Sequence, residues 1–209
     1  MKNARTPRRG LGTIAAIAAA ALLTLPGAGT ATAGIDSVER IVDGADNTIE
    51  AIQADTDIRF VAPLDGNPLS REWFQRGTAG FRVDGPGAKD FSGEIIVGYQ
   101  VGYAASFNGK LKASYSTPSL GVELSSDPSI TLGDLIPRAG IEIEVGFGPG
   151  IATVEAAKGS ISGGEGSIRM TNFHGTLTGV VGPANIRPFV TVVSSKGDRV
   201  TTFGRTWSN

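Results

Sequence analysis

The chain has 209 residues, of which 19 are basic and 20 acidic, and its formal net charge at pH 7 is −1. It contains no cysteine, which excludes disulfide bonds and thiolate metal sites and leaves packing or assembly to stabilise the fold. Its 30 glycines are about twice the usual share of ~7% and are spread along the chain, as is typical of many short strands joined by tight turns.

The first 33 residues have the features of a secretory signal peptide. A basic start with four Lys and Arg residues precedes an apolar run over 11–25, and small residues then lead to an A-x-A site that ends at Ala33. We predict cleavage between Ala33 and Gly34. The alternative, a retained transmembrane helix, is disfavoured because the run is shorter than the ~20 apolar residues that such a helix needs.

The predicted mature chain, residues 34–209, is acidic. Removal of the signal peptide takes away four basic residues and no acidic one, which leaves 15 basic (19 − 4) against 20 acidic residues, or −5. Nucleic acid is therefore a disfavoured partner, because no basic patch remains to neutralise phosphates. The length of the mature chain fits one or two domains.

Only one segment after the signal peptide has a helical pattern. Within 37–54, Val38, Ile41 and Val42 have the spacing of one helix face, and a helix is predicted there. From residue 57 onward the pattern is that of strands separated by turns, so we expect an all-β protein with a sandwich-like globular part. The turns are predicted at 65–68, 85–87, 148–150 and 196–198.

The segment 101–147 is predicted to be one long β-hairpin with its tip at 123–128. Its rising strand keeps an alternation of apolar and polar residues over 101–117, about 17 residues. The mean strand has ~5–6 residues, and a tilted membrane strand has ~9–11. This length is unusual for a compact sandwich.

The polar face of this hairpin carries charges of both signs. A register that places Lys112 opposite Glu142, and Lys110 opposite Glu144, pairs opposite charges across the ladder. Such pairs stabilise a hairpin and fix how its two strands align.

The apolar face of the hairpin has two interpretations, packing on a sandwich or contact with lipid. A single hairpin has open edges, so in lipid several subunits would have to close a ring. The polar face would then line a wet lumen and the apolar face would contact lipid. The lumen-facing residues would be Asn108, Lys110, Lys112, Arg138, Glu142 and Glu144. The lipid-facing residues would be Phe107, Leu111, Tyr115, Ile141, Ile143 and Val145.

An ordered set of short motifs, none of them specific alone, resembles the MspA-type mycobacterial porins, outer-membrane channels of mycolic-acid bacteria. The motifs extend over nearly the whole mature chain. They are Gly34-Ile35-Asp36, Val42-Asp43-Gly44, Pro63-Leu64-Asp65, Arg71-Glu72-Trp73-Phe74, Gly85-Pro86-Gly87-Ala88, Gly98-Tyr99-Gln100, Tyr115-Ser116-Thr117-Pro118, Gly148-Pro149-Gly150-Ile151, His174-Gly175-Thr176, Arg187-Pro188-Phe189 and Val200-Thr201-Thr202-Phe203-Gly204.

The resemblance implies a goblet-shaped homo-octamer with one central channel. Residues 34–100 and 148–209 would form a globular β rim domain, and 101–147 would join a 16-stranded transmembrane barrel, wide enough for an aqueous lumen. The implied function is passive diffusion of ions and small hydrophilic solutes across the mycolate outer membrane. The lipids of that membrane would surround the barrel, and no cofactor is implied.

In this family two adjacent aspartates at the hairpin tip form a narrow, cation-favouring constriction. Alignment from Pro118 places these positions at Glu123 and Leu124, with Asp127 a few residues later, so the acidic pair is not retained as such. We still predict a constriction of Glu123 and Asp127 and a cation preference, because a ring of carboxylates concentrates cations. For Asp127, capping of the turn before Pro128 is the alternative.

The remaining polar residues do not form a catalytic pattern. His174 is the only histidine, and a hydrogen-bonding role is expected for it rather than metal binding. The serine-rich segments have no nucleophile-elbow pattern, and the glycines at 163–166 are not followed by the Lys-Ser/Thr of a phosphate loop. No enzyme activity is predicted. The alternatives to a homo-oligomeric porin are a secreted β-sandwich module that binds the cell wall and one subunit of a mixed porin ring.

Overall fold

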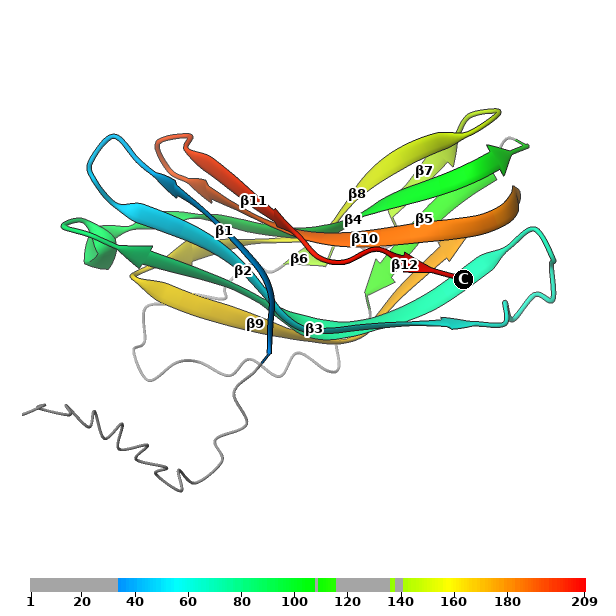
Figure 1. The fold of residues 1–209 in the computed structure, drawn as a ribbon, viewed down its shortest axis with the longest axis horizontal. Coiled ribbons are helices and arrows are strands. Elements are labelled where there is room, and N and C mark those ends of the chain that lie inside the picture. Colours follow the sequence, from blue (N-terminus) through cyan, green and yellow to red (C-terminus); the bar gives the residue numbers. More distant parts are fainter. Residues whose placement is uncertain (1–33, 108, 116–135, 138–140) are drawn as a thin grey trace, which may run out of the picture. The chain divides into compact units, whose positions relative to one another are not determined.

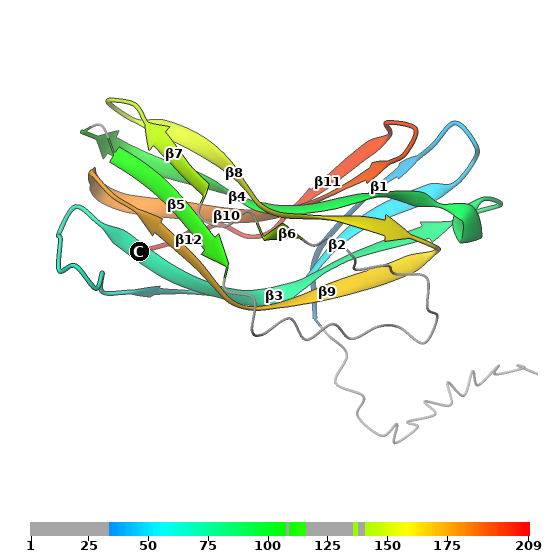
Figure 2. The same ribbon diagram turned by 180° about the vertical axis from the view of Figure 1, so that it is seen from behind.

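The computed structural model describes residues 34–107, 109–115, 136–137 and 141–209, which form two antiparallel β-sheets (Figures 1 and 2). The all-β prediction is confirmed. The first sheet has the order β1 (Ile35–Val42), β2 (Thr48–Val61), β3 (Arg71–Asp84), β9 (Glu165–Leu177), β5 (Gly109–Tyr115) and β7 (Ile141–Val145). The second has the order β11 (Arg199–Phe203), β10 (Val180–Ser194), β4 (Ser92–Ser106), β8 (Gly150–Ser162) and β6 (Ile136–Pro137).

Two short elements complete the described fold. Strand β12 (Trp207–Ser208) pairs with β10, and the single turn of 3-10 helix η1 (Ala88–Asp90) lies between β3 and β4. Within the described ranges, no helix is long and apolar enough to cross a membrane.

The core lies between the two sheets. Trp73 of β3 and Phe173 of β9 pack against Tyr99 of β4, with ring centroids 6.0 Å apart for Trp73–Tyr99 and 5.3 Å for Tyr99–Phe173. A second cluster includes Phe81 from the first sheet and Val190 from the second. Large side chains from both inner faces therefore interdigitate, as in a β-sandwich.

The predicted helix over 37–54 is wrong, because this segment forms β1, a turn and the first half of β2. Along β2, Ile49, Ala51 and Gln53 are buried and alternate with half-buried residues, which is the period of a strand. The helical spacing in β1 does not reflect burial, since Val38 and Val42 are 45% and 66% exposed on this edge strand. Pairing with β2 overrides the local pattern.

The predicted continuous strand over 101–117 is interrupted. Strand β4 ends at Ser106 in the second sheet, and β5 begins at Gly109 in the first sheet, where the Gly109 N–H donates to Ser106 Oγ at 3.1 Å. At Gly179 φ is +71°, and a Cβ there would lie 2.7 Å from Gly109 Cα. The alternation did not reveal this change of sheet because both segments keep a period of two.

The turns predicted at 65–68, 85–87 and 196–198 are confirmed. Figure 1 shows the β1–β2 and β10–β11 turns and η1 at one end of the sandwich. The β2–β3 connection, the end of β4 and the start of β8 lie at the other end. The segment between β4 and β8, which contains the hairpin, therefore begins and ends at this second end.

Replacing Asp43 by asparagine is expected to reduce the loss of folding stability that the protein undergoes when the pH is lowered. Hydrogen bonds from the Asn47 side chain, and then from the Asn47 and Ala45 backbone, hold the pKa of the Asp43 carboxyl below its ordinary value of 3.8. Because the folded-state pKa is the lower one, ionised Asp43 stabilises the fold above the unfolded-state pKa. This contribution is lost as the pH falls through the folded-state pKa.

The measurement is the thermal unfolding midpoint of the unassembled chain between about pH 6 and about pH 2. The midpoint of Asp43→Asn should fall less on acidification than that of the parent. Asp46→Asn, in the same turn, leaves the Asp43 hydrogen bonds intact and should keep the parental slope. Identical slopes for all three proteins would contradict the assignment.

Candidate functional site

The candidate site is the hairpin formed by β5 and β7. These strands pair antiparallel, with Lys110 opposite Glu144 and Lys112 opposite Glu142, so the predicted charge-pairing register is confirmed for the backbone. The side chains of Lys110 and Glu144 are exposed. In both of these pairs, a basic residue of β5 is therefore opposite an acidic residue of β7.

The hairpin strands also extend the sandwich. Strand β5 pairs with β9 from Leu111 opposite Leu177 to Tyr115 opposite Phe173. The short strand β6 pairs with β8, with Ile136 opposite Lys158. In the single chain, the hairpin segment therefore occupies the edges of β9 and β8.

The other predicted site residues are described to different extents. Phe107 is 64% exposed at the point where the chain leaves β4. Seven further predicted residues are placed by their strand and their pairing partners alone: Leu111, Lys112, Tyr115, Ile141, Glu142, Ile143 and Val145. Asn108, Glu123, Asp127 and Arg138 lie outside the described residues. Their roles in a lumen or at its constriction stay predictions.

An exposed apolar group, here called the apolar collar, lies beside the hairpin. It consists of Phe107, which the sequence predicts as lipid-facing, and of Phe147, Ile151 and Val181, which sequence reasoning did not assign to the site. Phe147, Ile151 and Val181 are 77%, 73% and 41% exposed. Backbone pairing brings the group to one end of the sandwich, because Ile151 lies opposite Gly102 of β4 and Val181 opposite Ala105. Phe147 continues the apolar alternation of β7, so that pattern contained a signal, whereas nothing in the sequence distinguishes the other two from core residues.

His174 has the hydrogen-bonding role that the sequence suggested. Its Nε2 lies 2.8 Å from Glu72 Oε1, and its ring stacks on Phe74 with centroids 4.8 Å apart. Glu72 Oε2 also accepts a hydrogen bond from the Leu64 N–H at 3.0 Å. Glu72 thus links β9 to the β2–β3 connection. Among the described residues, no group of three His, Cys, Asp or Glu side chains is placed to hold a metal ion.

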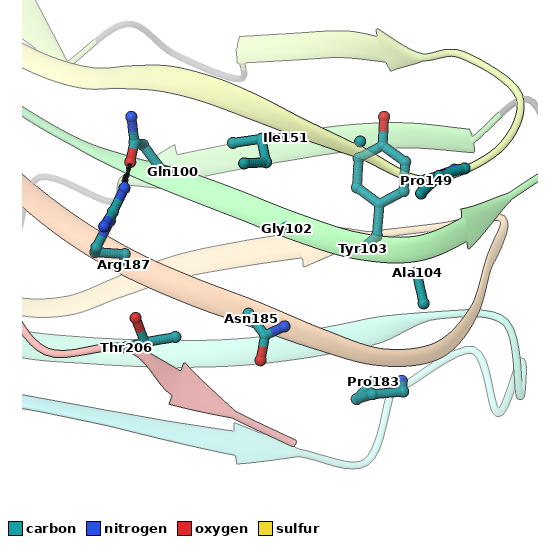
Figure 3. Close-up of a pocket in the computed structure, with 11 residues that line it drawn as sticks. Gln100, Gly102, Tyr103, Ala104, Pro149, Ile151, Pro183, Asn185, Arg187 and Thr206 are labelled. Carbon is teal, nitrogen blue, oxygen red and sulfur yellow. Dashed lines mark hydrogen bonds between the residues drawn. The ribbon is translucent and has the colours of Figure 1, made fainter.

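The outer face of the second sheet carries an open groove of about 600 Å³ (Figure 3). Gln100 of β4 accepts a hydrogen bond from Arg187 Nε of β10 at 3.0 Å, while Tyr103 and Ile151 supply apolar surface. Gly102 adds no side chain between them. The described lining residues include no carboxylate or histidine, so this groove offers hydrogen bonds and stacking but no acid–base pair.

These features define a class of protein: an all-β sandwich with an amphipathic hairpin inserted between two strands of one sheet. The MspA family model matches residues 43–208, nearly all of the predicted mature chain. The chain belongs to the MspA family, and the resemblance read from the short motifs is confirmed.

Relatives of this chain include porins of Mycolicibacterium smegmatis. The chain is 40% identical to Porin MspA over 202 residues, which cover 93% of this chain and 95% of that porin. It is 39% identical to Porin MspC over 202 residues, covering 93% and 94% of the two chains. Porin MspB is 39% identical over 188 residues, with 87% of each chain covered.

Proposed function

We propose that this protein is an oligomeric outer-membrane porin that forms a water-filled channel for ions and small hydrophilic solutes. Membership of the MspA family, with relatives that are themselves porins, supports this function. In the proposed assembly, which the family resemblance suggests is a homo-octamer, the part of the segment 101–147 that follows β4 supplies two strands of the stem. The rim is the sandwich, in which β4 continues to Ser106 and Val101 is buried in the core.

The observation that carries the proposal is the register of β5 and β7. It places Lys110 opposite Glu144 and Lys112 opposite Glu142, while the intervening residues Leu111 and Ile143 face each other in the ladder. Successive strand residues point to opposite faces. A ring of such hairpins would therefore have one charged wall and one apolar wall, as a channel in lipid requires.

The channel is proposed to prefer cations. Each subunit would place Glu123, and in one interpretation Asp127, at the narrowest point near the hairpin tip. The paired Lys and Glu residues of the stem contribute opposite charges that offset one another. The carboxylate ring at the tip then dominates the local potential, which attracts cations and repels anions.

The apolar collar fits a place at the membrane surface. Two of its four members are phenylalanines, Phe107 just before β5 and Phe147 just after β7. The four exposed apolar residues lie at the same end of the sandwich, and a concentration of exposed apolar surface is a feature of contact regions. We propose that the signal peptide directs export and that the collar then meets the lipid of the mycolate outer membrane.

The test is current across a planar bilayer after addition of detergent-extracted full-length mature protein, under a salt gradient. Discrete conductance steps with a cation-sided reversal potential are expected. Steps without selectivity would keep the channel and remove the acidic constriction. A well-folded preparation that gives no steps alone, but gives them with a related porin subunit, would support a mixed ring. Protein that leaves the cell envelope in aqueous buffer and never conducts would support a secreted binding module.

A further inference from the structure

A strand has two edges, and in the described structure β5 uses both. One edge pairs with β7 over residues 109–113, and the other pairs with residues 173–177 of β9. The backbone N–H and C=O groups of a strand alternate between its two edges, so each edge accepts a single neighbour. Strand β5 therefore has no edge left for another subunit along this stretch.

A closed barrel makes a different demand on the same strand. In a ring of hairpins, β5 keeps its own β7 on one side and must pair on the other side with β7 of the next copy, because an open edge is not tolerated in lipid. The edge that the ring needs is the one that β9 now occupies. Pairing with β9 and closure of the ring exclude each other.

We infer that residues 173–177 of β9 occupy the edge of β5 that the neighbouring subunit would use in the ring. Strand β5 must therefore separate from β9 before a second copy of this chain can pair with β5. The inference rests on the proposed channel function. The partner surface is the outer edge of β5, and its occupant in the assembly is β7 of the next copy. The unassembled subunit is therefore protected against pairing at this edge.

The sandwich holds β9 in place without help from β5. Strand β3 pairs with β9 along its whole length, from Arg71 opposite Leu177 to Arg82 opposite Glu165. Phe173 packs on Tyr99 of the other sheet. The ladder between β5 and β9 is shorter, and beyond β5 the sheet continues only with β7. Release of β5, together with β7, from β9 therefore breaks this one ladder and leaves these contacts intact.

The start of β5 provides a fixed point for this movement. The Phe107 N–H donates to the Gly179 carbonyl at 2.9 Å, and the Thr178 N–H donates to the Lys110 carbonyl at 2.9 Å. These bonds tie the first residues of the hairpin to the β9–β10 connection. The strand beyond Lys110 is then the part that exchanges partners.

Disulfide locking tests this inference, because the chain has no cysteine of its own. Lys112 lies opposite Thr176 in the β5–β9 ladder and opposite Glu142 in the β5–β7 ladder. Directly opposed residues in antiparallel strands have the Cα separation that a disulfide accepts. Lys112→Cys with Thr176→Cys therefore locks β5 to β9, whereas Lys112→Cys with Glu142→Cys locks only the hairpin.

Both full-length double variants are oxidised as unassembled chains, checked for the disulfide by mass spectrometry, and assayed for oligomers and bilayer steps before and after reduction. The disulfide between β5 and β9 should abolish oligomers and conductance steps until it is reduced. The variant with the hairpin disulfide, which shares Lys112→Cys, should conduct in both the oxidised and the reduced state.

Two outcomes would overturn the inference: conductance by the oxidised β5–β9 variant, or failure of this disulfide to form in the unassembled chain. Absence of steps from wild-type and reduced proteins alike would instead refute the channel function itself.

Discussion

Trp73→Ala is expected to lower the free energy of unfolding of the unassembled chain by about 3–5 kcal/mol, the range for truncation of a fully buried large aromatic side chain. Trp73 is 0% exposed and has an edge contact with Tyr99 and a tilted contact with Phe60, whose ring centroid is 6.4 Å away. The substitution leaves a cavity where the two sheets meet. It also removes aromatic contacts that the surrounding strands cannot replace.

The backbone of β9 explains why this cavity should not close easily. Gly175 lies directly on the Trp73 ring, since a Cβ at that position would be 2.2 Å from a ring atom. Strand β9 is held by its ladder with β3, in which Gly175 is opposite Trp73. Collapse into the cavity would have to bend two paired strands, and interiors relax only partly around such a loss.

Urea unfolding followed by far-UV circular dichroism measures this effect, and Trp207→Ala is the matched control. Trp207 is half-buried and its ring lies under the Arg205 guanidinium, 3.7 Å from the ring centroid. Trp207 packs on the margin of the core cluster that contains Trp73, and its cation–π contact is worth about 1 kcal/mol. Because Trp207 is only half-buried, the control should lose less stability than Trp73→Ala. Equal losses for the two tryptophans would show that Trp73 is not the centre of the core.

Glu123→Lys is expected to reverse the ion preference of the proposed channel. Each subunit changes by two charge units at the hairpin tip, so the ring at the constriction turns from acidic to basic. The reversal potential under a salt gradient should therefore move from the cation side to the anion side. Recording at about 0.1 M salt keeps the Debye length near 10 Å, so that the charge at the tip still acts across a narrow lumen.

Two further variants make this prediction specific. Glu123→Gln removes the charge without inverting it and should give an intermediate potential. Glu39→Lys makes the same charge inversion at an exposed position of β1 in the sandwich and should leave the potential cation-sided. If Glu123→Lys conducts with an unchanged potential, the constriction is not at this residue, and Asp127 or the stem charges must set the selectivity.

The hairpin shows how far the sequence alone determines this protein. Alternation of apolar and charged residues predicted strands on both sides of the tip, and charge complementarity predicted the register that β5 and β7 adopt. These properties are local or involve facing residues of one hairpin, so they can be read from spacing. The ordered motifs also identified the family, which the match over residues 43–208 confirms.

Three features were decided only by tertiary structure. The helical spacing in β1 is overridden by pairing with β2, because the free energy of a strand depends on its neighbours more than on its own residues. The change of sheet between Ser106 and Gly109 leaves no trace in a period-two pattern. The pairing of β5 with β9 joins segments about sixty residues apart, and no local pattern specifies which free edge a strand will find. The sequence by itself determined the strands, the family and the charges of the hairpin, whereas the three-dimensional fold decided which edges and apolar residues remain available to a partner.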